Sequence, residues 1–296
     1  MKATFVGALL LVATLAIGCG GGDGTKTLDI ADIGWTENTA IANLTKVLLE
    51  EELGYDQVLI NNRAELTEVY EAVATGELDA FQDVWLPNQQ DLLSSVEEDV
   101  EQLSFSYQGQ TEQGITIPSY MDINSLDQLN ESEAEMLFGI EPESVIMQRI
   151  SEEVIPAYNL KQKFVEASTD AMLAEIDNYY RNQEEFAFVA WSPHWMNQKY
   201  DLTYLEDPKD AFGELNDPAR ITTIVNEDLP EDDPVATAFM DALKLDEEQL
   251  NDLESTINEA GEPEEGARQW AQGNRDVWQP WVEAAQSAEE AQTRDS

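Results

Sequence analysis

Three tryptophans end or directly follow short apolar stretches with the spacing of β-strands. They are Trp35, Trp85 and Trp191. A quaternary ammonium group has no N–H to donate and a diffuse charge, so aromatic ring faces bind it, at about 0.5–2 kcal/mol per good contact. Open α/β sheets bind their ligands at the carboxyl ends of strands, which is where these indoles stand. The pattern therefore predicts an aromatic site for a quaternary ammonium ligand.

A core position is the alternative interpretation of these tryptophans, because a single Trp is more often buried than functional. A binding site is favoured because three tryptophans share the same position relative to a strand. The other four are interpreted as core or interface residues: Trp195, Trp270, Trp278 and Trp281. Two of these, Trp270 and Trp281, fall on amphipathic helical spacing.

Two parts of the sequence could donate hydrogen bonds to an anionic group on the same ligand. Residues 138–142 (FGIEP) lie between a strand and a helix start, so their backbone N–H groups could receive an anion. Gln90 offers a side-chain amide in the turn after Trp85. Many strand-to-helix turns look like this, so neither signal is specific alone.

The reactive side chains argue against an enzyme. His194 is the only histidine and Cys19 the only cysteine, which excludes a histidine-rich metal site, a Cys–His nucleophile pair and an internal disulfide. No phosphate loop or dinucleotide fingerprint is present, so neither a cofactor nor a metal is expected. His194 is interpreted as a hydrogen-bonded structural residue. Paired carboxylates among the 61 acidic residues keep acid–base chemistry open.

Alternating strand and helix patterns must position these side chains. Strands expected at 27–33, 58–60 and 78–84, with helices between them, call for a parallel sheet with helical crossovers. We therefore expect an α/β fold of two lobes, each a mostly parallel sheet flanked by helices, with the ligand in the cleft between them. The expected organisation is 27–113 for lobe 1, 114–215 for lobe 2, 216–285 for the return to lobe 1, and 286–296 for a flexible tail.

The charge balance restricts the partners. The chain has 15 basic and 61 acidic residues, a net charge of −46. Such a field disfavours nucleic acid and anionic membrane surfaces but is compatible with a cationic or zwitterionic small ligand. The acids are spread along the chain and lysine is scarce. These features indicate a halophilic source, where salt shortens the repulsion between charges.

The N-terminus is typical of an export signal, assigned to residues 1–19. Lys2 precedes an apolar core, 5–17, that is too short to span a bilayer. Cys19 and the glycines after it look like a lipoprotein attachment site followed by a tether, 20–26. Ordinary cleavage beside an incidental cysteine is the alternative. We expect a periplasmic protein, or one held by lipid at the outer face of the cytoplasmic membrane.

Five blocks of sequence carry a family resemblance. They are IGWTENTAIANLTKVLLEEELGY (33–55), GELDAFQDVWLPNQ (76–89), GITIPSYMDINSLDQL (114–129), FGIEPES with its helix (138–147) and VAWSPHWMNQKYDLTYLEDPK (189–209). Over nearly the whole mature chain the sequence resembles the substrate-binding proteins of glycine betaine/proline betaine ABC transporters. The resemblance implies a two-lobed periplasmic-binding-protein fold, type II-like, that closes on its ligand.

The resemblance also implies roles for individual residues. It implies that Trp35, Trp85 and Trp191 form a box around the trimethylammonium head. It implies that the backbone amides of Gly139 and Ile140 take the carboxylate.

The chain departs from the family at the carboxylate end. Gln90 stands where a carboxylate-binding histidine is common, and 143–144 replaces a turn that is usually glycine-rich. Either change could weaken carboxylate binding or tune the site for choline or carnitine. Asp83, His194 and Trp195 are candidates for supporting the box from behind.

The resulting expectation is a receptor that captures glycine betaine or proline betaine for osmoprotection. It would close on the ligand and deliver it to a membrane permease without covalent chemistry. A receptor for choline or carnitine is the alternative within the class. A sensory module without a transporter and an enzyme are the alternatives from other classes.

Overall fold

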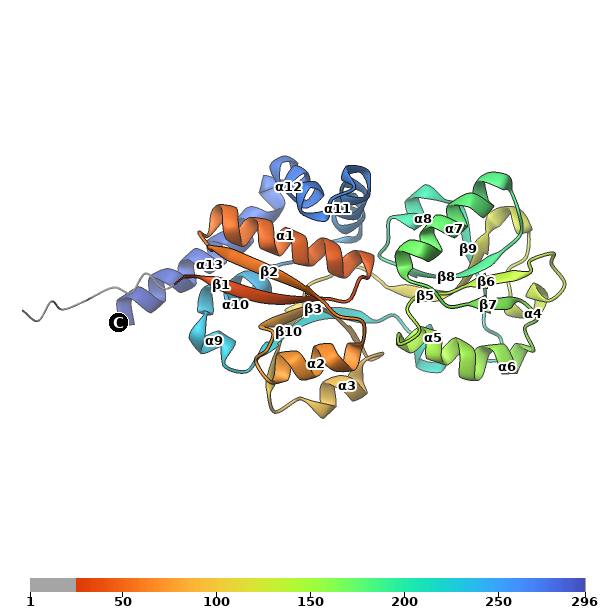
Figure 1. Ribbon diagram of the computed structural model, residues 1–296, viewed down its shortest axis with the longest axis horizontal. Coiled ribbons are helices and arrows are strands. Elements are labelled where there is room, and N and C mark those ends of the chain that lie inside the picture. Colours follow the sequence, from red (N-terminus) through yellow and green to blue (C-terminus); the bar gives the residue numbers. More distant parts are fainter. Residues whose placement is uncertain (1–24, 296) are drawn as a thin grey trace, which may run out of the picture.

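Two five-stranded sheets organise the computed structural model, which describes residues 25–295 (Figure 1). The strand orders are β2-β1-β3-β10-β4 and β7-β6-β8-β5-β9. The first sheet contains β1 (Thr27–Asp32), β2 (Gln57–Asn62), β3 (Ala80–Leu86), β4 (Val100–Phe105) and β10 (Arg220–Asn226). The second contains β5 (Glu112–Pro118), β6 (Met136–Phe138), β7 (Lys163–Val165), β8 (Ala187–Ser192) and β9 (Leu202–Tyr204). The two-lobed α/β architecture expected from the sequence is confirmed.

Helices flank both sheets, and α1 packs against α12 beside the first sheet (Figure 1). The helices of the first lobe are α1 (Thr36–Glu52), α2 (Leu66–Ala74), α3 (Gln90–Ser95), α9 (Leu229–Asp232), α10 (Pro234–Ala242), α11 (Glu247–Ala260), α12 (Pro263–Gly273) and α13 (Arg275–Asp295). Those of the second lobe are α4 (Leu126–Leu129), α5 (Val145–Arg149), α6 (Ile155–Tyr158), α7 (Thr169–Asn182) and α8 (Met196–Lys199). A π-helical turn lies at Ile150–Val154, and 3-10 turns lie at Ser119–Met121 and Gly213–Asn216.

Both sheets are mixed, which refines the expectation of mostly parallel sheets. Four strands of each sheet run in the same direction, whereas β10 runs antiparallel to its neighbours β3 and β4, and β5 runs antiparallel to its neighbours β8 and β9. The reason is the connection between the lobes. Since β5 and β10 enter their sheets from the other lobe, they start at the edge where the parallel strands end.

The central strands β3 and β8 end at the interface between the lobes. Their sequences, AFQDVWL and AFVAWS, are buried along almost their whole length, so each sheet has its core around one of these strands. Trp85 and Trp191 lie near the carboxyl ends of the two strands. The fold therefore brings one tryptophan from each core strand to the same interface.

The chain crosses between the sheets twice. It leaves the first sheet after Phe105, enters the second at Glu112, and returns between Tyr204 and Arg220. The expected lobe boundary at 113/114 thus falls inside β5. The expected flexible tail from residue 286 is helical, because α13 continues to Asp295.

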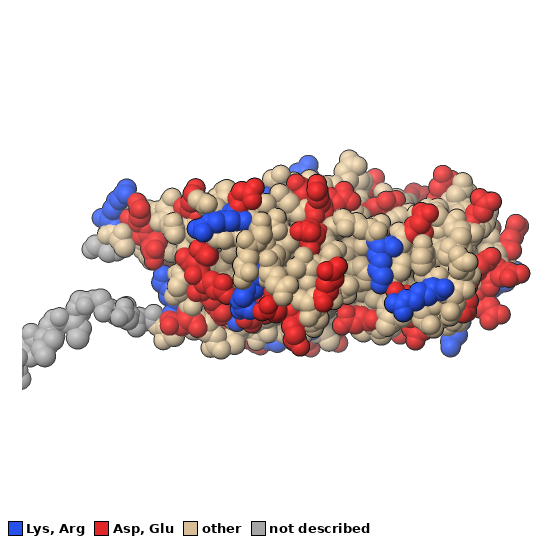
Figure 2. Space-filling model, turned by 90° about the horizontal axis from the view of Figure 1, so that it is seen from above, with Lys and Arg blue, Asp and Glu red and all other residues tan. Residues whose placement is uncertain are grey.

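Acidic side chains are spread over both lobes on the face that Figure 2 shows, with fewer basic ones between them. This distribution is that of a solvated surface. Among residues 25–295, no helix is both long and apolar enough to cross a membrane. The expected signal segment 1–19 and its Cys19 lie outside the described residues.

Candidate functional site

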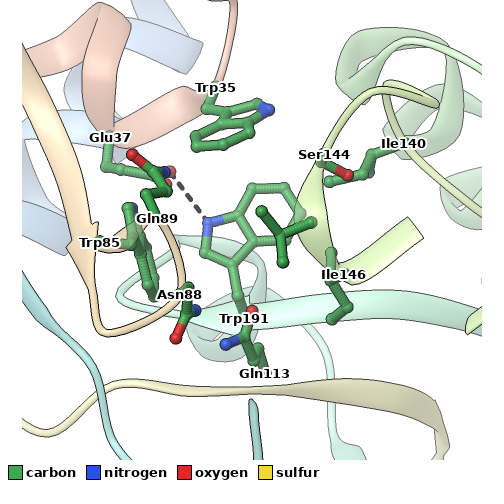
Figure 3. A pocket seen from close by; sticks show the side chains of 11 residues that line it. Trp35, Glu37, Trp85, Asn88, Gln89, Gln113, Ile140, Ser144, Ile146 and Trp191 are labelled. Atoms are coloured by element: carbon green, nitrogen blue, oxygen red, sulfur yellow. Dashed lines mark hydrogen bonds between the residues drawn. The ribbon is translucent and has the colours of Figure 1, made fainter. Parts of the chain in front are cut away.

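A cavity between the two lobes gathers the three predicted tryptophans (Figure 3). The space between its lining atoms is ≈ 430 Å³, part of which is open to solvent. The first lobe contributes Trp35, Glu37, Trp85, Asn88 and Gln89. The second contributes Gln113, Ile140, Ser144, Val145, Ile146 and Trp191.

Each tryptophan reaches the cavity from a different element. Trp35 lies between β1 and α1, directly after Gly34, whose φ of 87° allows the sharp turn there. Trp85 lies in β3 and Trp191 in β8. The three side chains are 8%, 5% and 5% exposed, so they line a largely desolvated space in which a cation–π contact is strongest.

Carboxyl groups hold two of the three indoles by their edges. The Trp85 Nε1–H donates to Asp83 Oδ1 over 2.9 Å, and the Trp191 Nε1–H donates to Glu37 Oε2 over 2.9 Å. Asp83, expected as a supporting residue, therefore contacts the box directly. These bonds fix the orientation of the rings without using their faces.

Glu37 is a cavity residue that the sequence analysis missed. It lies in the first turn of α1 and is 1% exposed. In sequence, an acid at this position indicates no more than a favourable interaction with the helix dipole. Burial raises the pKa of Glu37 from its ordinary 4.5 to about 7, against the hydrogen bond from Trp191, which lowers it.

Two further carboxyl groups are buried behind the cavity wall. Asp83 and Glu254 are both fully buried, and burial first, then the negative charge of Glu37, raises the pKa of each well above its usual range. Asp83 Oδ2 and Glu254 Oε1 have no hydrogen-bond partner among the described residues. We call Glu37, Asp83 and Glu254 the buried acid cluster. A cation in the cavity would stabilise its ionised form.

The predicted carboxylate-binding amides are engaged within the second lobe. Gly139 N–H donates to Val165 O over 2.8 Å, because the pairing of β6 with β7 continues past Phe138. Ile140 N–H points to the thioether of Met147, a weak acceptor, at 3.3 Å. Ile140 lines the cavity, whereas Gly139 does not.

Gln90 does not line the cavity either. It is the first residue of α3, is exposed, and donates to Ser94 Oγ over 3.2 Å. The turn after Trp85 closes with a bond from Gln89 N–H to Trp85 O over 2.8 Å. This turn brings Asn88 and Gln89 to the cavity and points Gln90 outward.

Ser144 is a polar group on the opposite wall (Figure 3). It precedes α5, is 3% exposed, and its Oγ has no hydrogen-bond partner among the described residues. The sequence signal is a serine before an apolar helix, which predicts a capping residue. The structure instead leaves its hydroxyl available to a ligand.

His194 and Trp195 lie behind the cavity and do not line it. His194 Nδ1 accepts from Met196 N–H over 3.0 Å, so its Nε2 carries the hydrogen and donates to Thr36 Oγ1 over 2.8 Å. Burial lowers the pKa of His194 to about 3, which keeps the ring neutral. Trp195 is 7% exposed, and its backbone N–H donates to Glu254. The remaining tryptophans at 270, 278 and 281 are buried in the first lobe.

No group of three or more His, Cys, Asp or Glu residues in the described part of the chain is placed to hold a metal ion. The buried acid cluster therefore has no metal geometry. A diffuse cation in the neighbouring cavity is the chemistry that the arrangement supports.

Comparison with known proteins identifies the class. A family model, the substrate binding domain of ABC-type glycine betaine transport systems (OpuAC), matches residues 26–273, and the chain belongs to this family. The family consists of substrate-binding proteins of transport systems, not of enzymes. Such proteins are extracytoplasmic and work with a membrane permease.

Individual relatives agree with the family. The chain is 30% identical over 123 residues to the glycine betaine/carnitine transport binding protein GbuC of Listeria monocytogenes, which covers 42% of this chain and 40% of that protein. It resembles the crystal structure of lactococcal OpuAC in its closed-liganded conformation with glycine betaine, at 27% identity and a TM-score of 0.77, over 87% of this chain and 99% of that one. An ABC-transporter choline binding protein in complex with choline has the same fold, at 22% identity and a TM-score of 0.76, over 92% and 99%.

Proposed function

We propose that this protein is the solute receptor of an ABC importer and binds a quaternary ammonium compound in the cavity lined by Trp35, Trp85 and Trp191. The observation that carries the proposal is that three indoles from both lobes meet in one desolvated cavity. A trimethylammonium group has no hydrogen-bond donor to satisfy and is suited to aromatic walls.

Binding would couple to closure of the two lobes. Trp35 and Trp85 belong to the first lobe and Trp191 to the second, so one cation contacts both. Each ring contact contributes about 0.5–2 kcal/mol, and only the closed form makes all three. The ligand therefore favours the closed form, which is the form presented to the permease.

Glycine betaine is the first candidate ligand. The family description and the titles of GbuC and lactococcal OpuAC support it. Its carboxylate would need donors at the Ile140 and Ser144 wall, where Ser144 Oγ is without a partner. Import of this solute would serve osmoprotection, in keeping with the acidic composition of a protein from a salt-stressed cell.

Choline is the second candidate, and one observation favours it. Glu37 places a carboxyl group in the cavity, and no Lys, Arg or His lines it. The carboxylate of a betaine would meet the field of the buried acid cluster, whereas the hydroxyl of choline is uncharged and could bond to Ser144. Cationic quaternary ammonium alcohols thus fit the electrostatics better than zwitterions do.

Calorimetric titration of the purified protein with glycine betaine and with choline tests the proposal. One-to-one binding of either ligand supports it, and the tighter one decides between the candidates. If neither ligand binds at low or at high salt, the tryptophans are core residues and the proposal is wrong.

Lipid anchoring is a separate part of the proposal. Cys19 would carry the lipid, and the glycine-rich segment after it would tether the receptor to the membrane surface. Replacing the cysteine, Cys19→Ala, should move the exported protein from the membrane fraction to the soluble fraction. Unchanged membrane retention would contradict an anchor at this residue.

A further inference from the structure

We propose that Glu254 and Thr36 are positioning residues that hold the two lobes together and so set how long a ligand stays bound. Neither lines the tryptophan cavity. The inference rests on the proposed function, because it concerns how firmly that receptor closes. The contacts come from residues 192–195, which begin at the last residue of β8 and which we call the clasp loop.

Two hydrogen bonds join consecutive residues of the clasp loop to the first lobe. Trp195 N–H donates to Glu254 Oε2 over 2.7 Å, and His194 Nε2–H donates to Thr36 Oγ1 over 2.8 Å. Glu254 lies on α11 and Thr36 begins α1, so the loop contacts two separate helices of the first lobe. A longer contact of 3.5 Å joins Ser192 Oγ to Glu247 at the start of α11.

The bond from Trp195 to Glu254 is buried and the bond from His194 to Thr36 is partly buried, which makes breaking them costly. His194 and Glu254 are both 0% exposed. The Trp195 N–H is buried, so removing the Glu254 acceptor leaves a buried donor unpaired. The His194 ring has its tautomer fixed by the Met196 N–H, so its donor to Thr36 is defined.

Both bonds cross from the second lobe to the first, so a motion that moves the second lobe away from α1 and α11 would break them. Apart from such contacts, the lobes are joined by the two crossovers between β4 and β5 and between β9 and β10. Opening the cavity would separate the clasp loop from α1 and α11. The clasp bonds therefore stabilise the closed form and should slow ligand release, with little effect on capture by the open form.

Matched substitutions can separate the clasp bonds from other effects. Glu254→Met and Glu254→Gln both remove the carboxyl group, but only glutamine keeps an acceptor for Trp195 N–H. Thr36→Val removes the hydroxyl that Thr36→Ser keeps. Thr45→Val is a control in the same helix, because Thr45 is buried and its Oγ1 has no partner among the described residues.

The test measures association and dissociation rates of glycine betaine and of choline by stopped-flow tryptophan fluorescence. We expect Glu254→Met and Thr36→Val to raise the dissociation rate by about 2- to 10-fold, the loss typical of one hydrogen bond, with association nearly unchanged. The dissociation rates of Glu254→Gln and Thr36→Ser should be closer to that of the parent than the rates of Glu254→Met and Thr36→Val. Dissociation rates that match the parent in both deletion variants would overturn the inference, whatever their melting temperatures.

Small-angle scattering of the ligand-free proteins gives a second readout that does not need a ligand. The deletion variants should have a larger radius of gyration than the parent and the Thr45→Val control, because more molecules are open. An unchanged radius in both would contradict the clasp. If the parent binds neither ligand but the deletion variants have the larger radius of gyration, the proposed function is wrong and the inference about the clasp loop is supported.

Discussion

The indole N–H of Trp191 donates to the carboxyl group of Glu37 over 2.9 Å, across the interface between the two lobes. Glu37 comes from α1 and Trp191 from β8. Because both residues line the cavity, the bond fixes one aromatic wall and also places a titratable group beside the proposed cation site. Ligand charge, pH and lobe closure are therefore linked through this pair.

Glu37→Gln should distinguish cationic from zwitterionic ligands. Glutamine keeps an acceptor for Trp191 but removes the charge, so choline should bind about tenfold more weakly, as expected for one nearby charge in a partly desolvated site. Glycine betaine, with no net charge, should lose less. Calorimetry at pH 8 measures both affinities, and equal losses would show that Glu37 acts only through the aromatic wall.

Choline affinity should rise with pH through about 7. Burial holds the pKa of Glu37 at about 7, and the groups that face it, Asp32, Asp83, Glu141 and Glu254, are all acidic. At lower pH the ligand must displace a proton, with a slope of at most about tenfold per pH unit for one group. The Glu37→Gln variant should flatten this profile between pH 6 and 8. A parent profile that is already flat would contradict the link.

Stability of the ligand-free protein should fall over part of the same range. The folded pKa of Glu37 is raised from 4.5 to about 7, so the folded state binds more protons than the unfolded state between these values. Its contribution to the free energy of unfolding is thus fully present below pH 4.5 and lost as pH rises through 7. Urea denaturation at pH 5 and pH 8 should show a smaller difference in Glu37→Gln than in the parent. An equal difference in both would place the effect elsewhere.

Trp85→Ala should weaken ligand binding by about tenfold or more while the protein stays folded, because it removes one cation–π wall. Trp85→Phe, which keeps a ring, should lose less. Circular dichroism checks the fold, and calorimetry the affinity. A loss below about twofold, smaller than one such contact provides, would remove Trp85 from the site.

Gln90→His should leave the affinity for glycine betaine within about twofold, since the side chain of Gln90 is exposed and donates to Ser94 on its own helix. The family resemblance, in which a carboxylate-binding histidine is common at this position, would instead favour a gain in affinity. Ser144→Ala provides the comparison, because its unpartnered hydroxyl faces the cavity and its loss should weaken binding. Tighter betaine binding by Gln90→His would show that α3 moves toward the ligand.

The sequence was most informative where function follows from position on a strand. Trp85 and Trp191 could be predicted because a strand of apolar residues has a definite end, and the α/β pattern places such ends at one edge. The structure brings both residues, with Trp35, to one cavity.

Contacts that depend on the closure of two lobes could not be predicted in this way. Glu37 and Trp191 are 154 residues apart, and nothing in the sequence around Glu37 indicates that it contacts Trp191. The bond from Gly139 N–H to Val165 O could not be predicted either, because the pairing of β6 with β7 continues one residue past the strand pattern. The turn after Trp85 determines whether Gln89 or Gln90 faces the cavity, and the spacing of residues does not predict which.

The most direct test of the aromatic cation site compares each quaternary ammonium ligand with its isosteric analogue, in which a neutral carbon replaces the charged nitrogen. Shape and apolar area are then matched, and only the charge differs. We predict that glycine betaine or choline binds the protein one-to-one in calorimetry, and that its carbon analogue binds at least about tenfold more weakly, because it lacks the cation–π attraction. Equal affinity for the two members of a pair would contradict the account.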